Sequence, residues 1–299
     1  MPWLFWALLS PFLFSITNFF DKFLIEKKIK DPIIITILSG ILYLLFGTVV
    51  LLVKGFPHIS FAQLILILLS GIFLEFYLIP YFKALSIDDT SQVVPLFQFV
   101  PVFSLVFAYI FLHEILTHNQ FIGFIGILIG GFVLGAEKLE KGIIQPRKSF
   151  WYMMLSSLLY AIVGILFKFV SEHHDFLTTL AYQAVGAGVG AIALLSYRPY
   201  RKKIMQEIRK LTANVWGLLF IAHFVSNAAE YSSFFAFTLA PVALVAVIGG
   251  AQPIFLIIEG IILSLWFPHI VKENIQKSTL LVKLASIVII IVGTYFIST

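Results

Sequence analysis

Long apolar runs constrain the fold of this chain more than any other feature of its sequence. A helix needs about 20 predominantly apolar residues to cross the hydrocarbon core of a bilayer. Ten stretches meet that requirement, at residues 3–21, 32–53, 61–83, 91–112, 119–136, 150–170, 176–197, 214–238, 241–266 and 279–298. The strands of a transmembrane β-barrel would alternate polar and apolar residues over about 10 positions, and these runs do not. The sequence therefore predicts an all-α polytopic membrane protein with ten transmembrane helices.

The composition excludes other classes of protein. The 299 residues are 60% hydrophobic and 12% charged, whereas an ordinary soluble domain carries about 25% charged residues. So little charge cannot cover a soluble globule of this size, and the apolar content is too high for a disordered chain. The absence of cysteine excludes disulfides, thiolate metal sites and cysteine nucleophiles.

The most polar linker, from Glu137 to Lys148, divides the chain into two halves of five segments each. We assign a first five-helix repeat to residues 1–140, a charged linker to 141–149 and a second five-helix repeat to 150–299. Two pairs of stretches align weakly between the halves, Leu13–Phe23 with Leu159–Phe169 and Tyr81–Phe103 with Ser233–Phe255. Because five crossings per repeat is an odd number, the second repeat must enter the membrane from the opposite side. Inverted repeats of this kind are typical of secondary transporters.

Lysine and arginine concentrate on one side of this predicted topology. The loops after segments one, three, five, seven and nine hold 18 of the 20, and the other loops hold Lys54 and Lys168. Positively charged loops face the cytoplasm. We therefore expect a multi-pass protein of the cell inner or plasma membrane with both termini outside. The basic cluster from Arg198 to Lys210 then contacts the inner leaflet rather than nucleic acid.

A sequence pattern runs through the later part of the first half. It consists of Tyr81-Phe82-Lys83-Ala84-Leu85, Ser91, Pro95, Pro101-Val102-Phe103, Glu114-Ile115-Leu116-Thr117, Gln120-Phe121-Ile122-Gly123 and Gly126-Ile127-Leu128-Ile129-Gly130-Gly131. This pattern resembles the EamA domain of the drug/metabolite transporter superfamily. The second half keeps Pro253 and departs from the pattern elsewhere. The resemblance implies two five-helix repeats and transport of small metabolites, often export.

Glu75 and Glu230 are acidic residues inside predicted segments three and eight. A charge at the centre of a membrane helix costs about 2.5–3.5 kcal/mol on insertion scales, so such a group usually faces a cavity or a partner. His223, Asn227 and Glu230 are spaced to share one helical face. The functional interpretation is a polar pocket between these segments that binds substrate or a proton. The alternative is interhelical hydrogen bonding that only holds the bundle together.

Four further polar residues lie within or at the ends of predicted segments, namely Lys22, Gln98, Lys168 and Glu259. Lys22 and Lys168 end equivalent segments, so either their ammonium groups reach the lipid headgroups or they pair with a buried glutamate or a substrate carboxylate. Glu259 is a candidate for the same site or for an ion pair with a neighbouring helix. Gln98 can hydrogen-bond either a substrate or a helix.

Pro101 and Pro253 occupy matching positions in segments four and nine. A proline removes an intrahelical hydrogen bond and bends its helix, and the freed carbonyl groups can line a cavity. These segments are therefore either gating elements or statically bent helices. No metal site is expected, since His113, Glu114 and His118 lack the HExxH spacing.

These features predict an integral-membrane secondary transporter that exports small polar metabolites, such as amino acids, by alternating access. Protons are the candidate coupling ion. We expect no enzymatic activity and no cofactor, and the sequence holds no P-loop for ATP-driven pumping. The expected oligomeric state is a monomer or a homodimer, because one chain carries both repeats. Two other classes stay open, namely a membrane enzyme acting on a lipid substrate and a non-transporting scaffold or sensor.

Overall fold

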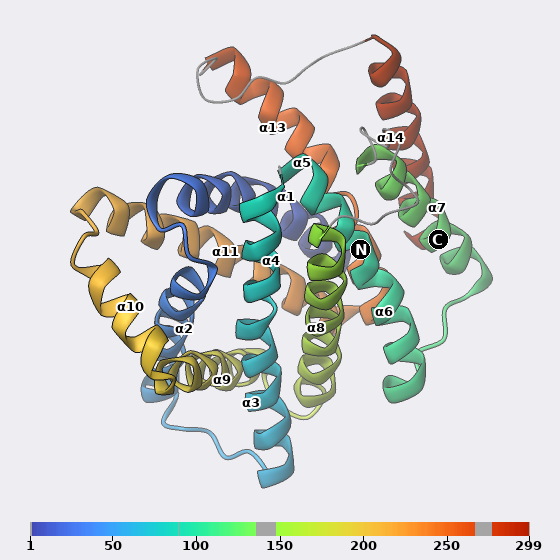
Figure 1. Cartoon of the computed structure of the whole chain (residues 1–299). Helices are drawn as coiled ribbons and strands as arrows, with labels where there is room; N and C mark the ends of the chain where they lie inside the picture. The colour runs from blue at the N-terminus through green and yellow to red at the C-terminus, as the bar shows by residue number, and fades with distance from the viewer. Residues whose placement is uncertain (1, 89, 136–147, 267–276, 299) are drawn as a thin grey trace.

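Helices make up the regular structure of the described chain. The computed structural model describes residues 2–88, 90–135, 148–266 and 277–298, and no strand occurs within them. The prediction of an all-α fold is confirmed for these residues. Figure 1 shows the helices gathered around the first helix, which crosses the middle of the molecule.

Among its described residues, the first half contains seven α-helices and three short helices of other types. The α-helices are α1 (Pro2–Phe23), α2 (Pro32–Lys54), α3 (Phe61–Phe76), α4 (Leu78–Ile87), α5 (Thr90–Val93), α6 (Phe99–Phe107) and α7 (His118–Gly135). The short ones are the π-helix η1 (Leu24–Lys28), the 3-10 helix η2 (Val94–Gln98) and the π-helix η3 (Ala108–Leu112). Predicted segment four is therefore broken into several helices.

The described part of the second half contains seven α-helices. They are α8 (Lys148–Ser171), α9 (Phe176–Ser196), α10 (Arg198–Ile208), α11 (Ala213–Leu239), α12 (Val242–Gly249), α13 (Gln252–Trp266) and α14 (Lys277–Ser298). Helix α10 was not expected, because its sequence is basic and polar rather than apolar. Predicted segment nine is interrupted between α12 and α13. The predicted charged linker, 141–149, lies mostly outside the described residues, which resume at Lys148.

The chain is a multi-pass membrane protein by the length and composition of its helices. Within the described residues, six helices could each cross a bilayer, or seven if α10 and α11, which are bent by 118° to each other, count as one span. Helix is present in all ten predicted intervals. Another apolar helical stretch, Leu96–Leu112, is shorter than a full span. The count of ten crossings stays a prediction.

Helices from the two halves pack closely on one another. The most extensive contacts join α2 to α9, α3 to α9, α1 to α11, and α7 to α14, and Figure 1 shows α7 and α14 side by side. Small residues permit this approach. A Cβ atom placed on Gly71 of α3 would lie 2.0 Å from the backbone oxygen of Gln183 in α9. The two backbones are therefore in direct contact, which only glycine allows at this position.

Candidate functional site

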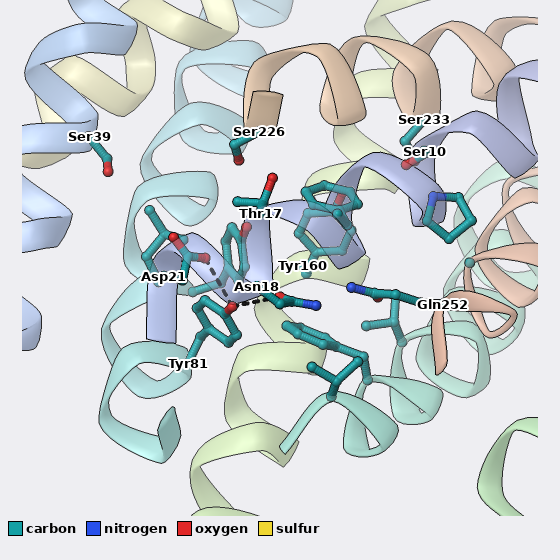
Figure 2. A pocket seen from close by; sticks show the side chains of 18 of the residues that line it. Ser10, Thr17, Asn18, Asp21, Ser39, Tyr81, Tyr160, Ser226, Ser233 and Gln252 are labelled. Carbon is teal, nitrogen blue, oxygen red and sulfur yellow. Dashed lines mark hydrogen bonds between the residues drawn. The ribbon is translucent and has the colours of Figure 1, made fainter. Parts of the chain in front are cut away.

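A central cavity of about 120 Å³ lies between helices of both halves. Residues of α1, α2, α4, η2 and α6 line it from the first half, and residues of α8, α11, α12 and α13 line it from the second. A buried water needs about 10–15 Å³ of such volume, so several waters or a small solute fit. Figure 2 shows polar side chains from several of these helices around the cavity.

The wall of the cavity combines aromatic and aliphatic side chains with separate polar groups. The hydroxyl and amide groups come from Ser10, Thr17, Asn18, Ser39, Tyr43, Tyr77, Tyr81, Gln98, Ser104, Tyr160, Ser226, Ser233 and Gln252. Asp21 supplies a carboxyl group and His223 an imidazole. The lining residues that the structure describes include no lysine or arginine. The cavity therefore offers donors, acceptors and one carboxyl group, but no permanently charged cation.

Tyr43 of α2 connects the cavity to Glu230 of α11. The Tyr43 hydroxyl donates a buried hydrogen bond of 2.5 Å to Glu230 Oε2. The ring of His223 packs edge-on against Tyr43, with 4.6 Å between ring centroids. No hydrogen-bond partner of His223 Nε2 is found in the described part of the chain. The structure thus brings His223 and Glu230 to one tyrosine, and Tyr43 and His223 line the cavity while Glu230 lies behind them.

Glu75 is fully buried in α3 but does not line the cavity. Its side chain packs against Gly40 of α2 and against Gly190 of α9. The carboxyl group lies beside the Gly40 backbone without hydrogen-bond geometry, and neither oxygen has a partner among the described residues. Glu75 and Glu230 are close enough for their charges to repel each other. Glu75 therefore lies beside the site, outside its wall.

Asn227 and Glu259, two other predicted site residues, do not line the cavity. Asn227 is partly exposed on α11, and Ser226 lines the cavity in its place. Glu259 of α13 accepts a hydrogen bond of 2.7 Å from the Ser15 hydroxyl of α1. Its other oxygen has no partner within the described ranges. Glu259 therefore joins α13 to α1 and is not part of the cavity wall.

Lys22 and Lys168 occupy equivalent places in the two halves. The Lys22 ammonium donates hydrogen bonds of 2.9 Å to the backbone oxygens of Leu85 and Asp88 at the end of α4. The Lys168 ammonium donates one of 2.7 Å to the backbone oxygen of Phe237 at the end of α11. A cation at a helix C-terminus stabilises the carbonyl groups left unpaired there. Each lysine therefore holds the end of a helix that lines the cavity, and its ion-pair partner in the described structure is an exposed glutamate of its own half, Glu26 for Lys22 and Glu172 for Lys168.

Gln98 and Pro253 line the cavity where the helices are interrupted. Gln98, at the end of η2, donates from Nε2 to the backbone oxygen of Gly250 at 2.7 Å. Gly250 lies between α12 and α13, and Pro253 lies in the first turn of α13. Pro101 is buried in the first turn of α6. Both prolines thus follow a helix break, so neither bends the middle of a long helix.

Glu114, part of the pattern in the first half, holds the start of α12. Its Oε2 accepts a hydrogen bond of 2.8 Å from the backbone N–H of Val242. Burial raises the pKa of the Glu114 carboxyl above its usual value, although the Val242 amide and the charge of Lys168 act in the opposite direction. The acidic residue of the pattern therefore connects the two halves directly.

Asp21, Asn18 and Tyr81 form a hydrogen-bonded group that the sequence analysis did not select. The Tyr81 hydroxyl lies 2.8 Å from Asn18 Oδ1 and 3.0 Å from Asp21 Oδ2. All three residues line the cavity, as Figure 2 shows. The available signal was weak: Asn18 and Asp21 share a helical face at a spacing of three residues, next to the more conspicuous Lys22.

Comparison with known proteins finds a family match for the first half of the chain. Residues 1–136 match the model of the EamA-like transporter family, which confirms the predicted resemblance to the drug/metabolite transporter superfamily. No curated protein matches the sequence significantly.

A solved crystal structure shares the fold of the chain. It superposes with a TM-score of 0.70 at 13% sequence identity, over 99% of this chain and 95% of that one. At this identity the similarity concerns the fold alone. Almost the whole of the chain, the second half included, therefore has the architecture of that structure.

Proposed function

We propose that this chain, whose residues 1–136 belong to the EamA-like transporter family, is a secondary transporter that moves small polar metabolites by alternating access. The observation that carries the proposal is the central cavity, which both halves line with buried polar groups. A bundle that served only as a scaffold would pair such groups internally. Here several atoms, including Asn18 Nδ2, Gln98 Oε1 and His223 Nε2, have no partner among the described residues.

The arrangement of the helices supports an inverted repeat. Helix α1 packs on α11 of the other half, and its counterpart α8 packs on α3 and α4. Helix α2 packs on its counterpart α9, and α7 on its counterpart α14. This reciprocal pattern is expected when two halves are related by a pseudo-two-fold axis, and it lets them rock about a site between them. Opening the cavity alternately to each side then requires no change inside either half.

Proton coupling is proposed for the buried glutamates. Glu230 contacts a cavity residue through Tyr43, and Glu75 has no partner in the described structure. An ionised carboxylate without a cationic partner is costly inside a membrane protein, so taking up a proton relieves that cost. Both groups can therefore bind and release protons as the cavity changes its exposure.

The proposed substrates are small metabolites with several polar groups, such as amino acids, and the proposed direction is export. The amides of Asn18, Gln98 and Gln252 can donate to a carboxylate, and Asp21 can accept from an ammonium group. The aromatic rings between them suit an apolar side chain. The proposed location is the cell inner or plasma membrane, and the active form is a monomer or a homodimer.

The test is transport of an amino-acid and polar-metabolite panel by the protein in proteoliposomes, with and without an imposed pH gradient. Movement of one solute that follows the gradient is the expected result. Solute transport that does not depend on the pH gradient would contradict proton coupling and leave the transporter proposal in place. No movement of any solute by folded protein would contradict a transporter and favour a lipid-directed enzyme or a scaffold.

Two variants test the glutamates in the same assay. Glu75→Gln and Glu230→Gln keep the size of each side chain and remove its titration, so we expect gradient-driven transport to be lost. Glu172→Gln is the matched control, because Glu172 is exposed at the end of α8 and does not line the cavity. Full gradient-driven transport by both test variants would overturn the coupling role.

A further inference from the structure

Tyr81 lies between two oxygen atoms of α1 that both need a donor. Its hydroxyl is within hydrogen-bond distance of Asn18 Oδ1 and of Asp21 Oδ2, at 2.8 and 3.0 Å. A phenol has one proton to donate, so it cannot serve both oxygens at once. A proton on a second group must supply the other hydrogen bond.

Two arrangements satisfy every contact in this group. In the first, Asp21 is protonated and donates to the Tyr81 oxygen, while Tyr81 donates to the carbonyl of Asn18. In the second, Asp21 is ionised and accepts from Tyr81, and the Asn18 amide is turned so that its N–H donates to the Tyr81 oxygen. The amide oxygen and nitrogen exchange places between the two, and both arrangements fit the same positions of the side chains.

The other end of the Asn18 amide is free. Asn18 is 3% exposed, lines the cavity, and its Nδ2 has no hydrogen-bond partner among the described residues. Figure 2 shows this nitrogen pointing away from Tyr81. A buried polar atom without a partner is costly, so the free end is ready to bind a water or a solute in the cavity.

We infer that Asp21, Tyr81 and Asn18 form a protonation switch in the wall of the cavity. With a proton on Asp21, Asn18 presents an N–H donor, which suits a carboxylate or carbonyl oxygen of a solute. Without that proton, Asn18 presents its carbonyl oxygen near the Asp21 carboxylate, which suits an ammonium group. One proton thus changes the kind of solute group that this wall binds.

The coupling of this switch to transport rests on the proposed function, but the switch itself does not. Proton binding by Asp21 and rotation of the Asn18 amide are properties of the protein without any solute. They can therefore be measured even if no transported solute is found.

Other ionisable groups surround Asp21, and the experiment must separate their signals. Lys22 on α1 is held by the end of α4 and by an ion pair of 3.0 Å with Glu26 in η1. Tyr77, which precedes α4, interacts electrostatically with Asp21. Helices α5 and α12 contribute no ionisable residue. The remaining ionisable groups that line the cavity or lie on the described helices in contact with α1 are Lys27, Lys28, Tyr43, Lys83, Tyr160, His223, Glu230, Tyr231 and Glu259.

The test is infrared difference spectroscopy of the full-length protein in lipid nanodiscs during a pH titration. A protonated carboxyl group has a C=O stretch that its ionised form lacks, and isotope-labelled asparagine marks the amide C=O. We expect one carboxyl band to be lost in Asp21→Asn. We expect the same band to shift in Tyr81→Phe, which removes only a hydroxyl group. A pH-dependent change of the labelled amide band should be lost in Asn18→Ala and in Asp21→Asn.

Tyr43→Phe is the matched control, because it removes a cavity hydroxyl that contacts Glu230 and not Asp21. It should shift a different carboxyl band and leave the Asp21 band in place. All carboxyl bands persisting in Asp21→Asn would overturn the switch, since Asp21 would then never be protonated. An amide band that does not change with pH would overturn it equally. If Asp21→Asn fails to fold, Tyr81→Phe and Asn18→Ala decide the question, because they alter only uncharged groups.

Discussion

Tyr43 and Glu230 join the two halves of the chain through one buried hydrogen bond of 2.5 Å. Tyr43→Phe removes the donor and leaves the Glu230 carboxyl group buried without it. Such a loss costs about 1–3 kcal/mol, so we expect a lower thermal midpoint in detergent. We also expect the pH profile of transport to shift, because the hydroxyl favours the ionised form of its partner.

Tyr182→Phe is the matched control for this substitution. The Tyr182 hydroxyl donates to the backbone oxygen of Pro57 at 3.0 Å, and Tyr182 does not line the cavity. It should lower stability without moving the pH profile. Identical profiles for Tyr43→Phe and the unaltered protein would show that Glu230 does not titrate during transport.

Helices α3 and α9 cross at a close backbone contact that depends on a glycine, Gly71. Gly71→Ala would place a methyl carbon 2.0 Å from a backbone oxygen of α9, and backbone cannot yield as a side chain does. Overpacking of a core costs about 1–3 kcal/mol, occasionally more, and we expect at least that loss. The measurement is thermal unfolding in detergent.

Gly217→Ala is the control for the glycine substitution. Gly217 lies within α11, and a Cβ there would meet no atom within 4 Å. Alanine in a helix is more favourable than glycine by about 0.5–1 kcal/mol, so this variant should be as stable as the original or slightly more so. Equal behaviour of the two alanine variants would contradict the close contact of α3 and α9.

Asp175 links the start of α9 to the end of α2. Its side chain accepts hydrogen bonds from the backbone and the hydroxyl of Thr178 and pairs with Lys54. Partial desolvation raises the pKa of Asp175, but the bonds from Lys54 and Thr178 outweigh it and lower the pKa to about 2. Because this pKa is below the ordinary value of 3.8, ionised Asp175 stabilises the fold above about pH 4, and the contribution is lost as the pH falls toward 2.

Two substitutions separate the helix cap from the ion pair. Asp175→Ala removes both, and loss of a cap alone costs about 1 kcal/mol. Asp175→Asn keeps a capping oxygen and removes the charge, and an exposed ion pair contributes about 0.2–1 kcal/mol. We therefore expect Asp175→Ala to be the less stable variant at pH 7. In both variants the Asp175 contribution, which the unaltered protein loses as the pH falls below about 4, should be absent from the pH dependence of the unfolding free energy. Equal stability at pH 7 would mean that the cap contributes nothing.

Hydropathy predicted the helices well because apolar length is a local property of the sequence. Segments four and nine were less predictable, because their breaks at Gln98 and Gly250 depend on a hydrogen bond between the two halves. Helix α10 escaped prediction because its residues are mostly polar. The rarity of charge inside spans drew attention to Glu75 and Glu230, of which only Glu230 contacts a cavity residue. Asp21 and Tyr81 meet through the packing of α1 on α4, which no local pattern reveals.

Orientation in the membrane is a property of the whole molecule, and the charge asymmetry makes it testable. Helix α10 and the residues after it carry Arg198, Arg201, Lys202, Lys203, Arg209 and Lys210, whereas the residues between α2 and α3 carry no lysine or arginine. Because the chain contains no cysteine, one introduced thiol reports one position.

Gln206→Cys on α10 and His58→Cys between α2 and α3 form a matched pair. Both positions are exposed, and neither substitution removes a lysine or arginine. If basic loops face the cytoplasm, a membrane-impermeant thiol reagent should label His58→Cys in intact cells and Gln206→Cys only after permeabilisation. The opposite labelling would invert the topology and place both termini inside. Labelling of both sites in intact cells would mean that the number of crossings between them is even, which ten spans do not allow.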